Sequence, residues 1–412
     1  MDRVSTMENP NKIPLLQKIA LLISLWGIIQ TAYSLYWNGT TEFLLPFAGE
    51  GVQEVSLFIP PDKKIAVSFV YKSNSLVLQP LGFLPQPADA VLTLLYPWKS
   101  VSYQLKLQPK MPEITTLYTS PLGRGKSGLV IYEVKAYAPY QTWIEDSTGL
   151  RYYAITTNGK WISLIGWPLT ATKYSLRIVV QDAAQNYTTS PLTFQPIKPS
   201  YRLRVIPLTT DFAKNQGQEV GLTNLTGDPN KDYEKLMAEF ARQTKVSIFD
   251  LTYRIPRFNE FWITNAVIMP LSQYEPSSLF GDERRFVLNG KTIRSSYHYG
   301  IDLVAPPQSP ILAPWKGKIL FADYNGASGN TILIDHGLGL YSIYMHLNSI
   351  AVSKGDIVNR GDTLGIIGKS GYSTGIHLHF GISIQGRYVD PTDWTNASWI
   401  EESILKPLQT YL

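Results

Sequence analysis

The run of short apolar segments punctuated by glycine in the last third of the chain places the tightest limit on its fold. Between residues 276 and 396 the sequence contains ILFADY, NTILIDHG, LYSIYMHL, DTLGIIGKSG and HLHFGISI. These segments are rich in β-branched and aromatic residues, and glycines separate them, as is typical of strands joined by tight turns. We therefore expect a mostly β protein whose C-terminal region is an antiparallel β-domain.

One of these segments, TGIHLHFGIS, holds two histidines on either side of one leucine. Side chains alternate between the two faces of a β-strand, so His377 and His379 share one face and Leu378 points to the other. Leu378, Phe380 and Ile382 can then fill a core while the two imidazoles share a surface or cavity. An isolated pair of this kind is more often two half-buried histidines than a functional site.

The distribution of histidine along the whole chain favours a site. The chain of 412 residues has five histidines, and all of them lie between residues 298 and 379: His298, His336, His346, His377 and His379. Histidines scattered over a surface would not be confined in this way. Their concentration indicates a metal centre, and no thiolate competes as a ligand because the chain has no cysteine.

An acidic partner for these histidines lies in the segment SSYHYGIDLVAP, which holds His298 and Asp302 four residues apart. Taken alone this spacing is common and weakly specific. Combined with the pair at residues 377 and 379 in one β-domain, it can supply two imidazoles and one carboxylate. Three protein ligands with an open fourth position are the catalytic form of a zinc site.

Length and charge exclude some classes of protein. A chain of 412 residues is too long for one ordinary core and suggests two or three domains. The net charge is +5, but from residue 276 onward 11 basic residues balance 11 acidic ones. The excess is spread thinly upstream, which is not the basic patch that nucleic-acid binding needs. A mildly basic chain is compatible with anionic envelope polymers or lipid headgroups.

The N-terminal residues 1–37 are expected to be an export signal or an N-terminal membrane anchor. Three basic residues precede an apolar run at residues 19–29, in which Ser24 is the only polar side chain. This run suits the core of a secretory signal, and Ala32-Tyr33-Ser34 is a plausible cleavage site. Whether the segment is cleaved or stays as an anchor is left open.

Two β-domains and a connector are expected next. Alternating apolar runs and turn residues predict a small β-domain at residues 38–111 and an immunoglobulin-like β-sandwich at 112–200. A group of prolines near residue 199 marks the boundary. The connector, 201–275, contains DPNKDYEKLMAEFARQTK, whose apolar spacing predicts a helix near 230–243 with Asp228 as its N-cap. The tail, residues 397–412, reads as one short helix broken at Pro407.

Several segments of the C-terminal region follow a known order and spacing: FGDERRFVLNGK, HYGIDLVAP, PILAPWKGKILFA, GNTILIDHG, GLYSIYMHL, GDIVNRGDTLGIIGKSGYSTGIHLHF and VDP. Together they resemble the catalytic domain of the lysostaphin-type (LytM-like) zinc metallopeptidases, which cut the peptide parts of bacterial peptidoglycan. The resemblance covers residues 276–396, less than a third of the chain. It implies a lysostaphin-like fold of the duplicated hybrid motif type for this domain.

The resemblance also assigns roles to individual residues. His298 and Asp302 match the first two zinc ligands of the family, and His379 matches the third. His377 and His346 match the two catalytic histidines, so no essential position is missing. His336, in a family-like IDHG turn outside this set, is expected to be structural.

The implied activity is a zinc-dependent endopeptidase that hydrolyses cross-links or stem peptides of peptidoglycan. Zinc lowers the pKa of its bound water towards about 7. His346 and His377 would orient this water, shuttle its proton or hydrogen-bond the developing oxyanion. The implied location is the bacterial cell envelope, in the periplasm, on the outer side of the inner membrane or secreted. The peptide bond that is cut stays open.

Three other interpretations are kept. The chain can be a non-enzymatic cell-wall-binding regulator that activates another wall hydrolase, although the complete set of ligands argues against this. It can hydrolyse another polymer, because fold does not fix substrate. The region between about 200 and 275 can also cover the active site, with Asn259 or Asn265 as the blocking side chain. Whether the two upstream β-domains are spacers or binding modules is left open.

Overall fold

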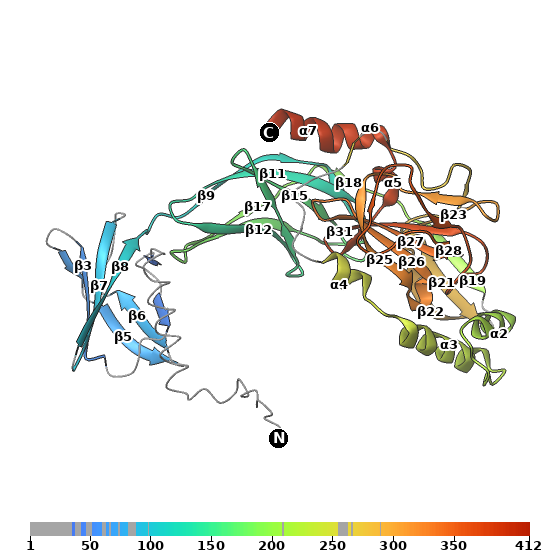
Figure 1. The fold of residues 1–412 in the computed structure, drawn as a ribbon, viewed down its shortest axis with the longest axis horizontal. Coiled ribbons are helices and arrows are strands. Elements are labelled where there is room, and N and C mark those ends of the chain that lie inside the picture. The colour runs from blue at the N-terminus through green and yellow to red at the C-terminus, as the bar shows by residue number, and fades with distance from the viewer. Residues whose placement is uncertain are drawn as a thin grey trace, which may run out of the picture. The chain divides into compact units, whose positions relative to one another are not determined.

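The computed structural model describes residues 35–37, 43–46, 52–59, 63–65, 67–72, 75–80, 88–97, 99–207, 210–253, 263–264, 267–288 and 290–412 (Figure 1). Most of the expected export segment lies outside these residues, as do Asn259 and Asn265, the two expected blocking side chains. No helix among the described residues is long and apolar enough to span a membrane. The described chain is mostly β, as the sequence predicts.

The chain divides into two compact units. The first holds the described residues up to 113 together with 135–141 and 180–188, and the second holds 114–134, 142–179 and the described residues from 189 to 412. The predicted sandwich and peptidase segments therefore both lie largely in the second unit.

The first unit is a small β-domain of two sheets. One sheet has the order β1-β8-β7-β3-β4, with β1 Leu35–Trp37, β8 Lys99–Leu107, β7 Ala88–Tyr96, β3 Glu54–Ile59 and β4 Lys63–Ile65. The other has the order β2-β6-β5, with β2 Phe43–Pro46, β6 Ser75–Pro80 and β5 Val67–Lys72. Trp37, Leu57 and Leu78 from both sheets are fully buried in one core. Residues 35–37, the end of the expected export segment, thus belong to this domain.

A β-sandwich lies largely in the second unit. One sheet has the order β14-β15-β11-β9, with β14 Ile155–Thr157, β15 Lys160–Gly166, β11 Ser127–Lys135 and β9 Glu113–Thr119. The other has the order β13-β12-β16-β17, with β13 Arg151–Tyr153, β12 Tyr140–Asp146, β16 Leu176–Asp182 and β17 Tyr187–Pro191. A separate two-stranded parallel sheet consists of β10 Leu122–Gly123 and β18 Pro196–Ile197. Ile131, Ile144 and Leu164 are fully buried in the interior of the sandwich.

The C-terminal domain is built on a large sheet in which every neighbouring pair is antiparallel, which confirms the predicted arrangement. Its order is β20-β23-β31-β27-β26-β25-β29, with β20 Glu275–Ser278, β23 Ile301–Val304, β31 Leu378–Ile384, β27 Leu340–Leu347, β26 Asn330–Asp335, β25 Gly317–Tyr324 and β29 Ile357–Val358, and β32 Arg387–Val389 also pairs with β31. A smaller sheet, β24-β30-β28, consists of Pro310–Leu312, Thr363–Ile366 and Ser349–Ile350.

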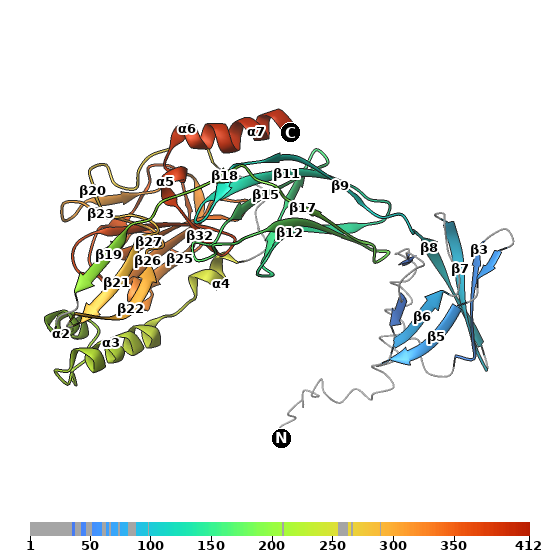
Figure 2. The same cartoon turned by 180° about the vertical axis from the view of Figure 1, so that it is seen from behind.

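The connector between sandwich and C-terminal domain contributes a strand and three helices. Strand β19 Leu203–Pro207 pairs with β21 Glu283–Leu288, which pairs in turn with β22 Lys291–Tyr297. The helices are α2 Thr210–Glu219, α3 Pro229–Gln243 and α4 Ile248–Thr252. In both views α2 and α3 lie beside the ends of β21 and β22 (Figure 1 and Figure 2).

The helix expected near residues 230–243 is confirmed as α3. The side chain of Asp228 accepts hydrogen bonds from the first-turn N–H groups of Asn230 and Lys231, as expected of its N-cap. Leu236 and Phe240 are buried on one face of the helix. Helix α2 was not expected, because its sequence TDFAKNQGQE shows little apolar periodicity.

The C-terminal tail differs from its prediction. Helix α5, Pro391–Trp394, precedes α6 Ala397–Ile400, a π-helical turn at Glu401–Leu405 and α7 Lys406–Tyr411. Pro407 lies in the first turn of α7, directly after the π-helical turn. A proline is tolerated in a first turn, where its missing N–H has no helical partner. Leu405 and Lys406 also have helical backbone angles, so the helical run continues through the π-helical turn and Pro407 does not break it.

The sandwich packs onto the C-terminal domain through buried polar contacts. The Lys126 ammonium group lies 2.9 Å from an oxygen of Asp390 and 2.8 Å from an oxygen of Asp393. The indole N–H of Trp394, which is fully buried, donates to the hydroxyl of Ser127 at 2.9 Å. The apolar interiors of the two domains also form one continuous cluster. The sandwich is thus built into the same body as the C-terminal domain.

Candidate metal centre

Strand pairing brings an aspartate and a histidine together at the centre of the large sheet. Asp302 on β23 lies directly opposite His379 on β31. Residues that face each other across an antiparallel pair project from the same side of the sheet. On the opposite side Leu378, Phe380 and Ile382 are fully buried, which confirms that the alternate residues of this segment fill the core.

A second histidine reaches this position from the turn that connects β22 to β23. The backbone of His298 is held by two hydrogen bonds, its N–H to Asp282 and its carbonyl to Gly281. Gly300 then passes so close to the site that a Cβ added there would lie 2.5 Å from Nε2 of His379. Any side chain at Gly300 would displace that imidazole, so glycine is required by the close approach.

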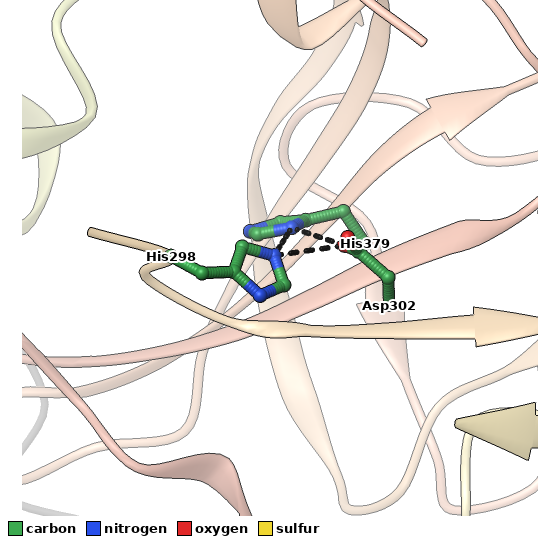
Figure 3. Close-up of side chains that lie close together, drawn as sticks. All are labelled: His298, Asp302 and His379. Atoms are coloured by element: carbon green, nitrogen blue, oxygen red, sulfur yellow. Dashed lines mark hydrogen bonds and ion pairs between the residues drawn. The ribbon is translucent and has the colours of Figure 1, made fainter. Parts of the chain in front are cut away.

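His298, Asp302 and His379 converge on one point (Figure 3). Nε2 of His298 lies 2.9 Å from Oδ1 of Asp302 and 3.0 Å from Nδ1 of His379. The same Nδ1 of His379 lies 2.9 Å from Oδ1 of Asp302. The structure therefore brings together the three residues that the sequence predicts as ligands.

The chemistry of these three atoms suits a cation. Nδ1 of His298 lies 2.9 Å from the carbonyl oxygen of Leu279. Because a carbonyl only accepts hydrogen bonds, a neutral imidazole at this position carries its proton on Nδ1 and presents the lone pair of Nε2. A neutral His379 can place at most one proton among the three atoms. A divalent cation would satisfy all three at once, and two imidazole nitrogens with one carboxylate oxygen are a donor set that zinc accepts.

The second carboxylate oxygen of Asp302, Oδ2, forms an ion pair with an arginine. Nη2 of Arg284, on β21, lies 2.7 Å from Oδ2 of Asp302 and 2.9 Å from the hydroxyl of Ser278. Burial by itself would raise the pKa of the Asp302 carboxyl, but the close contacts with the imidazoles of His298 and His379 outweigh it and hold this pKa well below its usual range. Asp302 is therefore a carboxylate whose Oδ1 is directed at the site.

His377 lies beside the three converging atoms. Its Nδ1 is 2.9 Å from the carbonyl oxygen of Gly375 and 3.2 Å from the hydroxyl of Ser373. Its Nε2 is 3.7 Å from Oδ1 of Asp302. The carbonyl fixes the proton on Nδ1, so the lone pair of Nε2 faces the site. Burial lowers the pKa of His377, although the nearby Asp302 opposes this, and the imidazole is neutral at neutral pH.

His346 is directed to the site by an irregularity in β27. The pairing of β27 with β26 shifts by one residue between Tyr344 and Leu347, which is a β-bulge, and His346 has a positive φ of 68°. Bulges and strained backbone of this kind are frequent beside functional sites. The ring centroid of His346 lies 4.9 Å from that of His377 and 6.2 Å from that of His379.

The protonation of His346 follows the pattern of His377. Its Nδ1 lies 2.8 Å from the carbonyl oxygen of Ser370, so Nδ1 carries the proton and Nε2 has the lone pair. Burial lowers the pKa of His346 to about 3, with a further contribution from His377 and His379. Both flanking imidazoles are thus neutral and have an unprotonated Nε2.

His336 lies outside this cluster, which agrees with its expected structural role. It is fully buried, with Nδ1 2.8 Å from the carbonyl oxygen of Lys316 and Nε2 2.7 Å from the hydroxyl of Ser342. Burial lowers the pKa of His336 to about 4. Sequence reasoning did not assign a role to Arg284 or Ser278. Arg284 lies in the segment FGDERRF, but nothing in its local pattern indicates a contact with Asp302.

An antiparallel β-domain with a site of two imidazoles and one carboxylate, flanked by two neutral histidines, defines a candidate metallopeptidase. Residues 296–391 match the model of peptidase family M23. The C-terminal segment of the chain therefore belongs to this family, which is a family of metallopeptidases.

Individual relatives match over the same part of the chain. A DD-carboxypeptidase/endopeptidase, Mpg, of Neisseria meningitidis is 36% identical over 124 residues, which are 30% of this chain and 28% of the relative. The peptidoglycan DD-endopeptidase ShyA of Vibrio cholerae is 35% identical over 119 residues, 29% of this chain and 27% of the relative. The chain thus spans less than a third of the length of these curated relatives.

A solved structure of similar sequence is the catalytic domain of the antimicrobial peptidase lysostaphin from Staphylococcus simulans. It is 31% identical, and the match covers 30% of this chain and 92% of that domain, with a TM-score of 0.26.

Proposed function

We propose that this protein is a zinc-dependent endopeptidase that hydrolyses peptide bonds of bacterial peptidoglycan. The observation that carries the proposal is the convergence of Nε2 of His298, Oδ1 of Asp302 and Nδ1 of His379 within about hydrogen-bond distance of one another, at 2.9 to 3.0 Å. Membership of the C-terminal segment in peptidase family M23 supports the reaction class. The name of the Vibrio cholerae relative, a peptidoglycan DD-endopeptidase, supports the substrate class.

The residues that would hold zinc are His298, Asp302 and His379, which leaves a fourth position for water or substrate. When bound there, zinc would polarise a carbonyl group and lower the pKa of a coordinated water. Arg284 holds Oδ2 of Asp302, so that Oδ1 stays directed at the other two ligands. The hydrogen bond from Nδ1 of His298 to Leu279 likewise fixes the ring of that ligand.

The two flanking histidines are suited to move a proton. In both, Nδ1–H is donated to a main-chain carbonyl, so Nε2 can accept a proton from the attacking water. The protonated imidazole can then hydrogen-bond the developing oxyanion or return the proton to the leaving amine. His377 is the nearer of the two to Asp302, with Nε2 3.7 Å from Oδ1. The ring centroid of His346 lies 4.9 Å from that of His377.

The location follows from the proposed substrate. Peptidoglycan lies outside the cytoplasmic membrane, so we place the protein in the bacterial cell envelope. The basic and apolar N-terminal sequence is consistent with export or anchoring. The partner that the site requires is a peptide of the wall, and the balanced charge of the C-terminal region gives no support to a nucleic acid.

The experiment that tests the proposal is digestion of purified sacculi by the full chain, followed by mass spectrometry of the released peptides. Sacculi with diaminopimelate stems and with lysine stems are digested in parallel, with chelator, and with zinc restored after chelation. We expect release of peptides cut at one type of bond, loss of release with chelator and recovery with zinc.

Two variants complete the experiment. His298→Ala removes a ligand and should abolish release, whereas His336→Asn, which replaces a buried histidine outside the site, should retain it. Absence of release from both types of sacculus by zinc-loaded protein would refute the proposed endopeptidase. Release that is unaffected by chelation and by His298→Ala would refute the metal centre.

A further inference from the structure

The helices of the connector contact the loop that positions the flanking histidines. This loop, residues 370–376, is here called the histidine loop. It directly precedes His377, and the carbonyl oxygen of its first residue, Ser370, accepts a hydrogen bond from His346. Helices α2 and α3 lie upstream of the segment that matches the peptidase family, residues 296–391. They nevertheless pack against the histidine loop at two successive residues.

The first contact is a pair of hydrogen bonds between Gln216 of α2 and the main chain of Ser373. The amide Nε2 of Gln216 donates to the carbonyl oxygen of Ser373 at 2.8 Å, and its Oε1 accepts from the N–H of Ser373 at 3.2 Å. That N–H also lies 3.0 Å from the carbonyl oxygen of Gly371. Gln216 and Ser373 are each only 5% exposed. Loss of the glutamine side chain would leave a buried carbonyl without this donor.

The second contact is aromatic. The ring of Tyr372 lies edge-on to Phe240 and to Tyr233 of α3, with ring centroids 6.0 and 6.5 Å apart. Edge-to-face pairs at this separation are favourable. Together with Gln216, these contacts hold residues 372 and 373 in place from outside the family domain.

The histidine loop in turn sets the protonation of both flanking histidines. The hydroxyl of Ser373 donates to the carbonyl oxygen of Gly375 at 2.7 Å, and that oxygen lies 2.9 Å from Nδ1 of His377. The carbonyl oxygen of Ser370 lies 2.8 Å from Nδ1 of His346. If the loop moves, neither carbonyl fixes the proton on Nδ1, and the lone pair of Nε2 is no longer assured at the site.

We propose that Gln216 is a positioning residue of the active site, which acts through Ser373 to keep His377 in the tautomer that has an unprotonated Nε2. The inference rests on the proposed function, in which His377 accepts a proton. On this inference, helices α2 and α3, which precede the segment that matches the family, help to position the residues of the active site. The inference also predicts that the part of the connector at residues 210–243 supports turnover and does not block it.

The test uses the full chain and a matched control. Gln216→Ala removes the two bonds to Ser373. Gln385→Ala is the control, because the fully buried amide of Gln385 makes the same two bonds to the main chain of Tyr153, at 2.7 and 2.9 Å, on the side of the sheet that meets the sandwich. Gln385→Ala also loses a longer bond to the carbonyl oxygen of Leu164, at 3.4 Å, so a general loss of stability should affect the control at least as much as Gln216→Ala.

Three readouts separate positioning from simple destabilisation. We expect Gln216→Ala to lower kcat on a soluble wall peptide about tenfold or more with little change in KM, as loss of a supporting contact commonly does. Zinc affinity should stay unchanged, because the proposed ligands lie on β23, on β31 and in the turn before β23, and not on the histidine loop. With histidine labelled by ¹⁵N, the Nδ1–H signal of His377 should be lost or averaged in Gln216→Ala, while that of buried His336 serves as an internal reference.

A conservative variant sharpens the test. In Gln216→Glu the protonated carboxyl group can donate to the carbonyl of Ser373, whereas the ionised form cannot. The activity of Gln216→Glu relative to the unchanged protein should therefore rise as the pH falls. A pH-independent ratio would count against a direct role of the donor.

The outcomes distinguish this inference from the proposed function. If Gln216→Ala keeps the kcat and the His377 tautomer, or raises the kcat, or if Gln385→Ala lowers kcat to the same extent, the inference is overturned. If no form of the protein cuts wall peptides, the proposed function fails. The labelled histidines would still report whether Gln216 sets the tautomer of His377.

Discussion

The two ends of strand β31 bury polar groups in opposite ways. Beyond its C-terminal end, Gln385 pairs its amide with both main-chain groups of Tyr153, and Arg387 lies 2.8 Å from Oδ2 of Asp146. A cation there meets an anion and the amide of Gln385 meets its partners, although Nε of Arg387 is buried without a hydrogen-bond partner. At its N-terminal end, His379 meets Asp302 and His298, and the three converging atoms share at most one proton when both imidazoles are neutral.

The difference separates a structural contact from a ligand site. A buried polar group that is satisfied within the protein contributes about 1 kcal/mol per hydrogen bond, whereas an unsatisfied one costs more than that. The end of β31 at the sandwich therefore stabilises the fold by itself. In the proposed function a cation completes the end at His379, so binding and not stability would explain its composition. A substitution at the sandwich end should therefore lower the free energy of unfolding, whereas one at His379 should lower zinc binding and activity.

The largest effect is expected from His379→Leu. Loss of a ligand should reduce hydrolysis of wall peptides by at least about 10³-fold, because the metal contributes several kcal/mol to the transition state. The free energy of unfolding of the chelated protein should change by less than about 1 kcal/mol, since an apolar side chain of similar size replaces a poorly satisfied polar one. Urea unfolding in the presence of chelator measures this. A much larger loss of stability would show that His379 is structural.

The opposite result is expected from Asp146→Leu. Asp146 accepts hydrogen bonds from Arg387, from the hydroxyl and N–H of Thr148 and from the N–H of Leu150. Its removal leaves the half-buried guanidinium group of Arg387 without its anion, which should cost about 3 to 5 kcal/mol of unfolding free energy. Zinc affinity should be unchanged. A variant that binds zinc more weakly, or that unfolds like the unchanged protein, would contradict the division between the two ends.

Part of this arrangement can be predicted from the sequence. Strands β25, β26, β27, β30 and β31 follow from local patterns, because side-chain alternation and glycine spacing are properties of neighbouring residues. The alternation in HLHF places His379 opposite the core residues Leu378 and Phe380, as the structure confirms. Spacing suggested a set of two imidazoles and one carboxylate, but the choice of His379 over His377 as the third ligand came from resemblance to a family.

The remaining contacts of the site depend on pairs that are distant in the sequence. Gln216 and Ser373 are separated by 157 residues, and Asp146 and Arg387 by 241. No periodicity in either segment specifies such a partner. The bulge that directs His346 also results from how β27 pairs with β26. Local sequence gives the strands and the candidate ligands, but the contacts that position them are set by the packing of whole domains.

His336 is a buried histidine in which both ring nitrogens have hydrogen-bond partners, so it can be compared with His379. Burial lowers its pKa to about 4, below the ordinary value of 6.5, so the unfolded chain binds a proton there that the folded chain does not. Between pH 6.5 and 4 stability should therefore fall as the pH falls, by about 3 kcal/mol at the lower limit. His336→Asn, which keeps a donor near Lys316, should lack this contribution. The difference in unfolding free energy between the two proteins, measured by urea at several pH values, should shrink on acidification.

The smallest effect is expected from Arg284, which holds the carboxylate of Asp302 opposite His379. Nη2 of Arg284 contacts both Asp302 and Ser278. Arg284→Lys keeps the positive charge but shortens the side chain, so the ammonium group should not reach both partners. The carboxylate of Asp302 then has more freedom, and zinc affinity should fall about tenfold, as for other contacts that orient a ligand. Competition with a chromophoric chelator measures this affinity.

Arg285→Lys is the control for this variant, because Arg285 pairs with Glu283 at the surface and does not contact a ligand. It should bind zinc like the unchanged protein. Equal affinities for Arg284→Lys and Arg285→Lys would mean that His298, Asp302 and His379 are held in place by the strands alone. The contact between Arg284 and Asp302 would then belong to the fold, like that between Arg387 and Asp146, and the contrast between the two ends of β31 would be confined to the three converging atoms.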